Sequence, residues 1–363
     1  MKKRIVAVLM SVVMAGALAA CGSSSDSSTS ASSVSDAGTV ASSVDTKAEE
    51  SSTESTTAAS SGGTTTIRMA LPTWVGYGAL YVAQDKGFFE EQGLDVELSI
   101  IEGLAERKQA LISGNLDGLA TSVDVLINLE GSGIPMGLVW LLDRSNGSDG
   151  IVATSDCKSP ADLKGKNVAA EIGSTDHYFL LQVLKEYGLT EDDINIVPMN
   201  VGDAGTAFVA GQVDAAATYD PYLSQGVEAG GVAFTTADYD IDLMDAIGFS
   251  DDFIEQNPDA VQAFVTAVSE ASSYIAENRD ECVPIIADGL KLEGEDVSST
   301  MDVLESYDLS GNIDQMGADD DNRGKLYDTV AGISQFYADE GLNDGVVEAT
   351  DLIDPDFVRA LNK

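Results

Sequence analysis

The sequence predicts an α/β protein with two lobes, each a mainly parallel sheet flanked by helices, and a ligand cleft between the lobes. The first observation is a repeat, because residues 110–121 (ALISGNLDGLAT) match residues 207–218 (AFVAGQVDAAAT) in pattern and position. In both segments two apolar residues end a helix, and Gly114 or Gly211 follows where a left-handed residue would stop it. The second observation is that strands and helices alternate on both sides of each repeat.

The elements of the two halves follow one another in the same order. In the first half we expect a strand at 67–71, a helix at 79–86 ending at Gly87, a strand at 94–100, and a strand ending at Thr121. In the second half we expect a strand at 167–171, a helix at 177–187 ending at Gly188, a strand at 194–198, a helix at 204–210, and a strand ending at Thr218. The remaining chain has apolar residues at helical spacing in four segments, 258–277, 281–290, 297–304 and 324–339.

The chain is expected to cross between the lobes twice, at 138–151 and at 237–250. This places lobe 1 at 67–145 and 245–363, with the helical tail packed on it, and lobe 2 at 146–244. In open α/β sheets, ligands bind beyond the carboxyl ends of the strands. Binding residues are therefore expected in the loops 72–78, 102–103, 122–124, 143–150, 173–177 and 219–222.

Composition excludes several classes of function. The chain of 363 residues carries 61 acidic and 19 basic side chains, a formal net charge of −42. Nucleic-acid binding needs clustered Lys and Arg, so it is not expected. One His and three Cys do not support zinc clusters or a catalytic triad, and the run Asp319–Asp321 does not continue as a calcium-binding loop. We expect no cofactor, no metal and no enzymatic activity.

The N-terminal segment is typical of an exported lipoprotein. Three basic residues precede the apolar run 5–18, and Leu18-Ala-Ala-Cys21 looks like a bacterial lipobox, in which the cysteine is acylated. We expect a signal peptide at 1–20, lipidation of Cys21, and a disordered Ser/Thr-rich tether at 21–66. The alternative is an ordinary cleaved signal with a coincidental cysteine. An exported location allows Cys157 and Cys282 to form a disulfide, but two free thiols are equally consistent with the sequence.

The loops expected at the cleft carry motifs that resemble those of substrate-binding proteins of nitrate/sulfonate/taurine-type ABC importers, a branch that also includes binders of thiamine precursors. The matching segments cover essentially all of 67–363 and are 76–89 (GYGALYVAQDKGFF), 93–96 (GLDV), 163–168 (LKGKNV), 173–178 (GSTDHY), 211–215 (GQVDA), 219–222 (YDPY), 257–261 (NPDAV) and 274–278 (YIAEN).

The resemblance implies a type 2 periplasmic-binding fold that closes on its ligand and delivers it to a permease and its ATPase. It also implies candidate ligand contacts. Ser122, Ser174 and Thr175 would donate hydrogen bonds, Trp74 and Tyr77 would form apolar walls, and Tyr219, Asp220 and Tyr222 would close the cleft. Asp143 and Asn146 lie in the loop at the first crossing, and His177 follows Thr175 in the second-lobe helix.

Several of these candidates have a structural alternative. Trp74 could belong to the core, His177 could be a satisfied structural residue, and Asp220 could simply cap a helix that begins at Pro221. The loop 142–150 is expected to place Asp143 and Asp149 near the cleft. Together with Glu102, Asp124, Asp176 and Asp220 they make the candidate wall more acidic than an oxyanion site requires, which favours cargo with a cationic nitrogen, such as taurine, or a heterocycle.

We therefore expect a monomeric, lipid-anchored extracytoplasmic receptor for a small organic nitrogen or sulfur compound. The alternatives are a receptor for a thiamine-precursor-like heterocycle and a ligand sensor.

Overall fold

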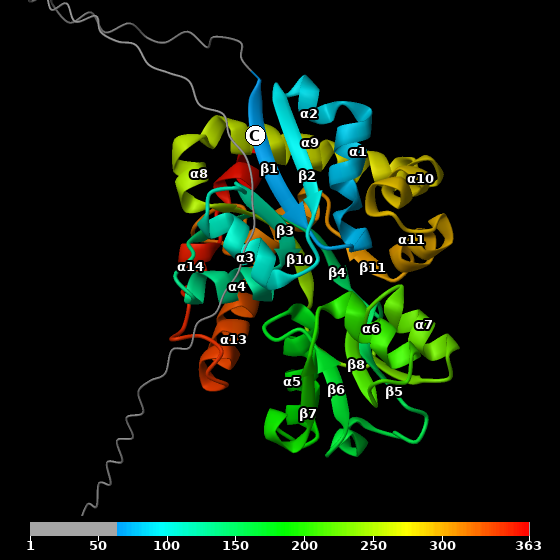
Figure 1. The fold of residues 1–363 in the computed structure, drawn as a ribbon. Coiled ribbons are helices and arrows are strands. Elements are labelled where there is room, and N and C mark those ends of the chain that lie inside the picture. The colour runs from blue at the N-terminus through cyan, green and yellow to red at the C-terminus, as the bar shows by residue number, and fades with distance from the viewer. Residues whose placement is uncertain (1–63, 363) are drawn as a thin grey trace, which may run out of the picture. The chain divides into compact units, whose positions relative to one another are not determined.

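The computed structural model describes residues 64–362 (Figure 1). The predicted signal peptide, Cys21 and all but the last three residues of the predicted tether lie outside the described residues. The first strand begins at Thr65, two residues before the predicted start of the folded part. Among the described residues, no helix combines the length and the apolar character needed to cross a membrane.

The strands form two separate sheets, which lie in the two lobes seen in Figure 1. The first sheet has the order β11-β4-β10-β3-β1-β2. Its strands, in chain order, are β1 (Thr65–Leu71), β2 (Leu94–Ile100), β3 (Gly118–Ser122), β4 (Met136–Ser145), β10 (Met244–Ser250) and β11 (Leu304–Ser306). The second sheet has the order β7-β6-β8-β5-β9. Its strands are β5 (Asp149–Ala153), β6 (Asn167–Ala170), β7 (Asn195–Pro198), β8 (Ala215–Tyr219) and β9 (Val232–Thr235).

The core of each sheet is parallel, as predicted, and in it β1 lies between β2 and β3 and β6 lies between β7 and β8. The strands that connect the lobes add antiparallel pairs. β10 lies antiparallel between β3 and β4, and β5 lies antiparallel between β8 and β9. The chain enters β5 and β10 from the crossings between the lobes, that is, from the side of the cleft. These two strands therefore run antiparallel to their neighbours.

The repeat places its glycines where the sequence predicts them. Gly114 and Gly211 have φ of 68° and 69°, in the left-handed region, and each stands two residues after the end of its helix, α3 (Leu104–Ile112) or α6 (Val201–Val209). Gly87 and Gly188 follow α1 (Gly78–Lys86) and α5 (Thr175–Glu186) with φ in the same region. A residue without Cβ adopts this conformation at little cost, so each of these glycines ends its helix.

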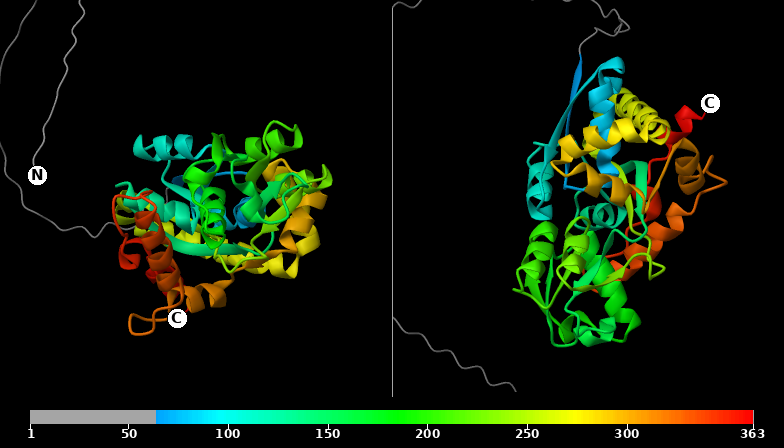
Figure 2. Two further views of the ribbon diagram at one scale, coloured as in Figure 1. Left: turned by 90° about the horizontal axis from the view of Figure 1, so that it is seen from below. Right: turned by 90° about the vertical axis from the view of Figure 1, so that its right-hand side faces the viewer.

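The other helices complete the two lobes. They are α2 (Phe88–Glu91), α4 (Val123–Gly131), α7 (Tyr222–Glu228), α8 (Asp251–Gln256), α9 (Pro258–Glu277), α10 (Arg279–Leu290), α11 (Gly294–Met301), α12 (Leu309–Met316), α13 (Leu326–Asp339), α14 (Ala349–Leu352) and α15 (Asp356–Leu361). In the tail, α9 and α10 pack on α1, and α13 packs on α4, so these helices cover the first sheet as expected (Figure 2).

The sequence predicts lobe 1 at 67–145 and 245–363 and lobe 2 at 146–244. Strands of the first sheet come from 65–145 and 244–306, and those of the second from 149–235. The chain passes between the sheets at 145–149 and again at 235–244. Ser145 and Thr236 stand at these two crossings, with their hydroxyl oxygens 3.1 Å apart.

Candidate functional site

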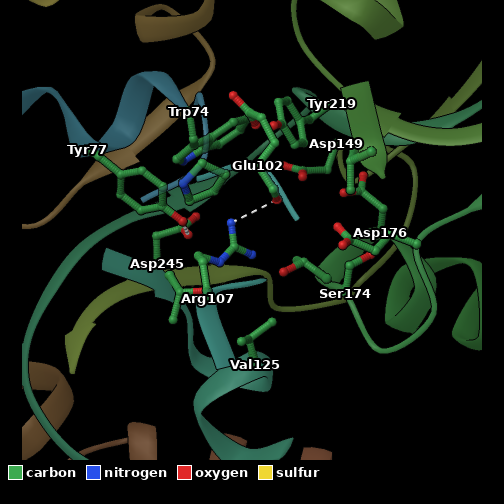
Figure 3. A pocket seen from close by; sticks show the side chains of 15 residues that line it. Trp74, Tyr77, Glu102, Arg107, Val125, Asp149, Ser174, Asp176, Tyr219 and Asp245 are labelled. Atoms are coloured by element: carbon green, nitrogen blue, oxygen red, sulfur yellow. Dashed lines mark hydrogen bonds between the residues drawn. The ribbon is translucent and has the colours of Figure 1, made fainter. Parts of the chain in front are cut away.

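A pocket lies between the two sheets, at the carboxyl ends of their parallel strands (Figure 3). Its lining combines aromatic, acidic and hydroxyl side chains from both lobes, namely Pro72, Trp74, Tyr77, Glu102, Arg107, Thr121, Val125, Asp149, Glu171, Ser174, Thr175, Asp176, Val201, Tyr219 and Asp245. The space is about 500 Å³ with its open mouth included, but the centre of a water molecule can occupy only about 40 Å³ of it. The lobes are therefore nearly closed on one another.

The loop after β1 supplies an aromatic wall. Trp74 donates a hydrogen bond from its indole Nε1 to Asp143 at 3.3 Å, and its ring meets the ring of Tyr219 edge to face at 5.5 Å between centroids. Gly76 makes this packing possible, because a Cβ there would lie 1.8 Å from the Asp143 carboxylate and 2.5 Å from the Trp74 nitrogen. The wall is thus fixed from behind by a buried carboxylate and completed by an aromatic ring from the second lobe.

The amino end of α5 supplies the opposite wall. Ser174 caps this helix, since its hydroxyl accepts a hydrogen bond from the His177 backbone N–H at 3.2 Å. Thr175 and Asp176, in the first turn, also line the pocket. The Thr175 hydroxyl is hydrogen-bonded to that of Ser122, which stands at the end of β3 in the first lobe. This contact ties the two lobes together at the edge of the pocket.

Two glutamates in the lining are held by backbone donors. Glu102 accepts hydrogen bonds from the backbone N–H of Thr73 at 3.2 Å and from its hydroxyl at 2.5 Å. Glu171 accepts from the backbone N–H of Leu104 at 2.7 Å, so it connects the second lobe to the start of α3 in the first. Burial raises the pKa of Glu171, although this hydrogen bond and Arg107 both act to lower it.

Three aspartates in the lining are more deeply buried. Asp149, Asp176 and Asp245 are 5%, 2% and 7% exposed. Burial raises the pKa of each well above its ordinary value, and the charges of neighbouring carboxylates add to the effect. Asp245 accepts a hydrogen bond from the Tyr77 hydroxyl at 2.5 Å, whereas Oδ1 of Asp176 is buried without a partner.

Arg107 is the one basic side chain in the lining, and the sequence prediction did not include it. Its Nη1 donates to the carbonyls of Ile101 and Glu102 at 3.0 and 3.1 Å, and its Nε is buried without a partner (Figure 3). Arg107 lies between Leu104 and Leu111 on the buried face of α3. A charged residue on an otherwise apolar helix face was the pattern that could have identified it.

Five of the predicted ligand contacts line the pocket: Trp74, Tyr77, Ser174, Thr175 and Tyr219. Ser122 is not in the lining, but its chain neighbour Thr121 is, and the Ser122 hydroxyl is hydrogen-bonded to that of Thr175. Asp143 lies behind Trp74, where burial raises its pKa to about 8. Their role in binding stays a prediction.

The other four predicted contacts do not reach the lining. Asn146 lies in the turn between β4 and β5, where its backbone N–H donates to the carbonyl of Val303 at 3.1 Å. Asp220 accepts from the Ser224 N–H at 3.0 Å at the start of α7, and the Tyr222 ring packs over Gly202 of α6. The imidazole of His177 points into lobe 2, where its Nδ1 accepts from the Gly173 N–H at 3.2 Å. Burial lowers the pKa of His177 to about 4, so the ring is neutral at pH 7.

The described residues offer no metal centre and no disulfide. Across 64–362, no three His, Cys, Asp or Glu side chains are grouped so that they could hold a metal ion. Cys157 and Cys282 are free and buried, one in each lobe.

Comparison with known proteins agrees with this architecture. A family model described as NMT1/THI5 like matches residues 74–282. A Brucella abortus (strain 2308) protein named only as a binding protein is 28% identical over 235 residues, 61% of this chain and 73% of the relative. The taurine-binding periplasmic protein of Escherichia coli K12 is 27% identical over 201 residues, 54% of this chain and 62% of the relative. Among solved structures, the alkanesulfonate-binding protein SsuA of Xanthomonas axonopodis pv. citri, bound to MOPS, superposes with a TM-score of 0.65 at 20% identity, over 80% of this chain and 98% of that chain.

Proposed function

The chain belongs to the NMT1/THI5-like family, whose model matches more than half of it, and on that premise we propose that it is the extracytoplasmic solute-binding component of an ABC importer. It captures a small organic compound between its lobes and delivers it to a membrane permease driven by an ATPase. The observation that carries this proposal is the pocket itself, which is built from both lobes and lies at the strand ends where α/β folds bind ligands.

Closure of the lobes is the step by which the protein would hold its cargo. Three of the contacts between the lobes lie at the pocket: the Ser122–Thr175 hydroxyl pair, the Glu171 carboxylate with the Leu104 N–H, and the edge contact of Trp74 with Tyr219. All three must break when the lobes separate. A ligand that touches both walls favours the closed state and shifts the population toward it.

The cargo is a small organic nitrogen or sulfur compound. The names of the relatives support a taurine-like or sulfonate-like molecule, since one relative is named for taurine and one structural neighbour for alkanesulfonates. The rings of Trp74, Tyr77 and Tyr219 favour a second candidate, a flat heterocycle of the thiamine-precursor kind, because aromatic side chains stack well on such rings.

We also propose that Cys21 carries the lipid that holds the protein at the outer face of the cell membrane. The Leu18-Ala-Ala-Cys21 motif supports this, and the Ser/Thr-rich segment after it gives the receptor room to reach its permease. The protein would act as a monomer, because one chain supplies both walls of the pocket.

A thermal-shift screen tests the solute-binding role. A compound that binds only the folded protein raises its melting midpoint with concentration. The panel should contain sulfonates, taurine, amines, pyrimidines and flavins. At least one class is expected to raise the midpoint, and calorimetry should then give one site per chain. No response to any class would count against this function.

A further inference from the structure

The lining of the pocket is strongly unbalanced in charge. Five carboxylates line it, from Glu102, Asp149, Glu171, Asp176 and Asp245, against the single guanidinium of Arg107. Glu102 and Glu171 are already satisfied by backbone N–H groups. The three aspartates are buried more deeply, and burial favours their neutral form by raising the pKa of each, whereas a cation beside them would favour the charged form.

One oxygen of the buried Asp176 side chain lacks a hydrogen-bond donor. Its side chain is 2% exposed, its carboxylate points into the pocket (Figure 3), and its Oδ1 has no hydrogen-bond partner. A buried carboxyl either keeps its proton or needs a donor or a cation to satisfy its charged form. The helix end beneath Asp176 and the Arg107 side chain are the two positive features nearby, and Arg107 already uses Nη1 on two carbonyls. A ligand in the pocket can supply the missing partner.

The missing partner is larger than a metal ion. No three acidic side chains among residues 64–362 converge closely enough to hold a metal. The aspartates stand around the pocket rather than at one point, with Asp245 on the side of Tyr77 and Asp176 on the opposite side (Figure 3). An organic cation can contact several such walls at once, because its charge is spread over several atoms or covered by alkyl groups.

The aromatic rings of the lining also favour a cationic ligand. Trp74, Tyr77 and Tyr219 line the same space as the aspartates. The face of an aromatic ring attracts ammonium groups, and rings combined with carboxylates are a recurrent way to recognise alkylated nitrogen. A sulfonate or nitrate would instead be repelled by each carboxyl that is ionised.

We propose that the cargo is an organic cation, whose positively charged nitrogen lies between Asp149, Asp176 and Asp245 and against the rings of Trp74 and Tyr219. This inference rests on the proposed solute-binding function and narrows its ligand to compounds with a net positive charge and no free sulfonate. Arg107 then keeps the β2–α3 turn in place and limits the number of positive charges that the pocket accepts.

Matched compounds of one size test the sign of the charge. Choline and benzamidine are the cationic probes, and 3,3-dimethylbutan-1-ol and benzamide are their neutral analogues. Isethionate is the anion of choline's length, taurine is the zwitterion, and calcium chloride tests a simple metal cation. Titration of the full chain is expected to show that at least one cation raises the melting midpoint and binds about tenfold or more tightly than its neutral analogue.

A variant then tests whether Asp176 binds the charged nitrogen of the ligand. Asp176→Asn keeps the size of the side chain and removes its charge, and should weaken binding of the cation about 30-fold or more. Glu186→Gln, at the exposed far end of the same helix α5, is the control and should leave the affinity unchanged. If Asp176→Asn does not fold, as judged by circular dichroism, Asp245→Asn provides the same test from the opposite wall.

Three results would overturn the inference: equal binding of the neutral analogues, an equal effect of calcium, or no binding of either cation. If isethionate or taurine binds and the cations do not, the cationic class is wrong while the solute-binding function stands. If none of these probes and no compound of the thermal-shift panel binds, the result would instead count against the solute-binding function itself.

Discussion

Replacing Asp143 by Asn tests how the site is built, because this carboxyl fixes the aromatic wall from inside the protein. Asp143 is 1% exposed, and its Oδ2 has no hydrogen-bond partner. Its Oδ1 accepts the Trp74 indole N–H at 3.3 Å, a contact that the Asn carbonyl oxygen can keep. The substitution therefore removes a titratable group with little change in shape.

The magnitude follows from the pKa of Asp143. Burial raises it from an ordinary value of 3.8 to about 8. The folded protein thus holds a proton that the unfolded chain releases, so the contribution to stability is fully present below pH 4 and is lost as the pH rises to about 8. Each pH unit in this window is worth ~1.4 kcal/mol. Asp143→Asn should therefore be more stable than the wild type by about 4 kcal/mol at pH 7 and by about 2 kcal/mol at pH 5.

Urea unfolding of the two proteins at pH 5, 6, 7 and 8 measures this difference. Other carboxyls are present in both proteins, so the difference in unfolding free energy reports Asp143 together with its coupling to the neighbouring Asp149 and Asp245. Asp321→Asn, on an exposed turn, is the matched control and should differ from the wild type by the same small amount at every pH. A difference between wild type and Asp143→Asn that does not grow with pH would refute the reasoning.

Four further substitutions test other parts of the account. Gly114→Ala and Gly211→Ala should each lower the unfolding free energy by about 1 kcal/mol, because φ is positive at both sites although no atom lies within 4 Å of an added Cβ; equal urea midpoints for variant and wild type would contradict this. Ser174→Ala should cost about 1 kcal/mol through the lost cap of α5 and should also weaken ligand binding, as measured by calorimetry. Cys21→Ala should move the protein from the membrane fraction to the soluble fraction, and mass spectrometry should show a diacylglyceryl group on the wild type only.

The elements that could be predicted from sequence are those with a clear hydrophobic periodicity and a residue that ends them. α9 and β2 have the predicted bounds, and the glycines after α3 and α6 end the helices as expected. By contrast, α4 was not predicted, because nearly every residue from Val123 to Leu129 is buried and a helix buried on all sides shows no amphipathic pattern. The neighbouring β4 is buried along almost its whole length, so its alternation is hidden in the same way.

The site was predictable at the level of loops but not of side chains. Strand ends predicted the loops 72–78 and 219–222, since a loop after a strand must lie at the sheet edge, and the resemblance to the importer family selected Trp74, Tyr77 and Tyr219 within these loops. Neither signal resolved how each side chain is turned. They could not show that Tyr222 turns onto α6 while Tyr219 faces the pocket. Arg107 was missed for a related reason: it belongs to a helix, and its approach to the pocket depends on how α3 is rotated against the first sheet.

Movement of the lobes is the central claim, and pulsed electron paramagnetic resonance measures it most directly. Spin labels on Ile112→Cys at the end of α3 and Val209→Cys at the end of α6 would report the distance across the cleft, since these side chains are 65% and 46% exposed. Cys21→Ala provides the background, and Cys157 and Cys282 are buried. On addition of a compound that binds in the thermal-shift screen, the distance distribution should become narrower and shift to shorter values. An identical distribution with and without saturating ligand would contradict closure of the lobes on the cargo.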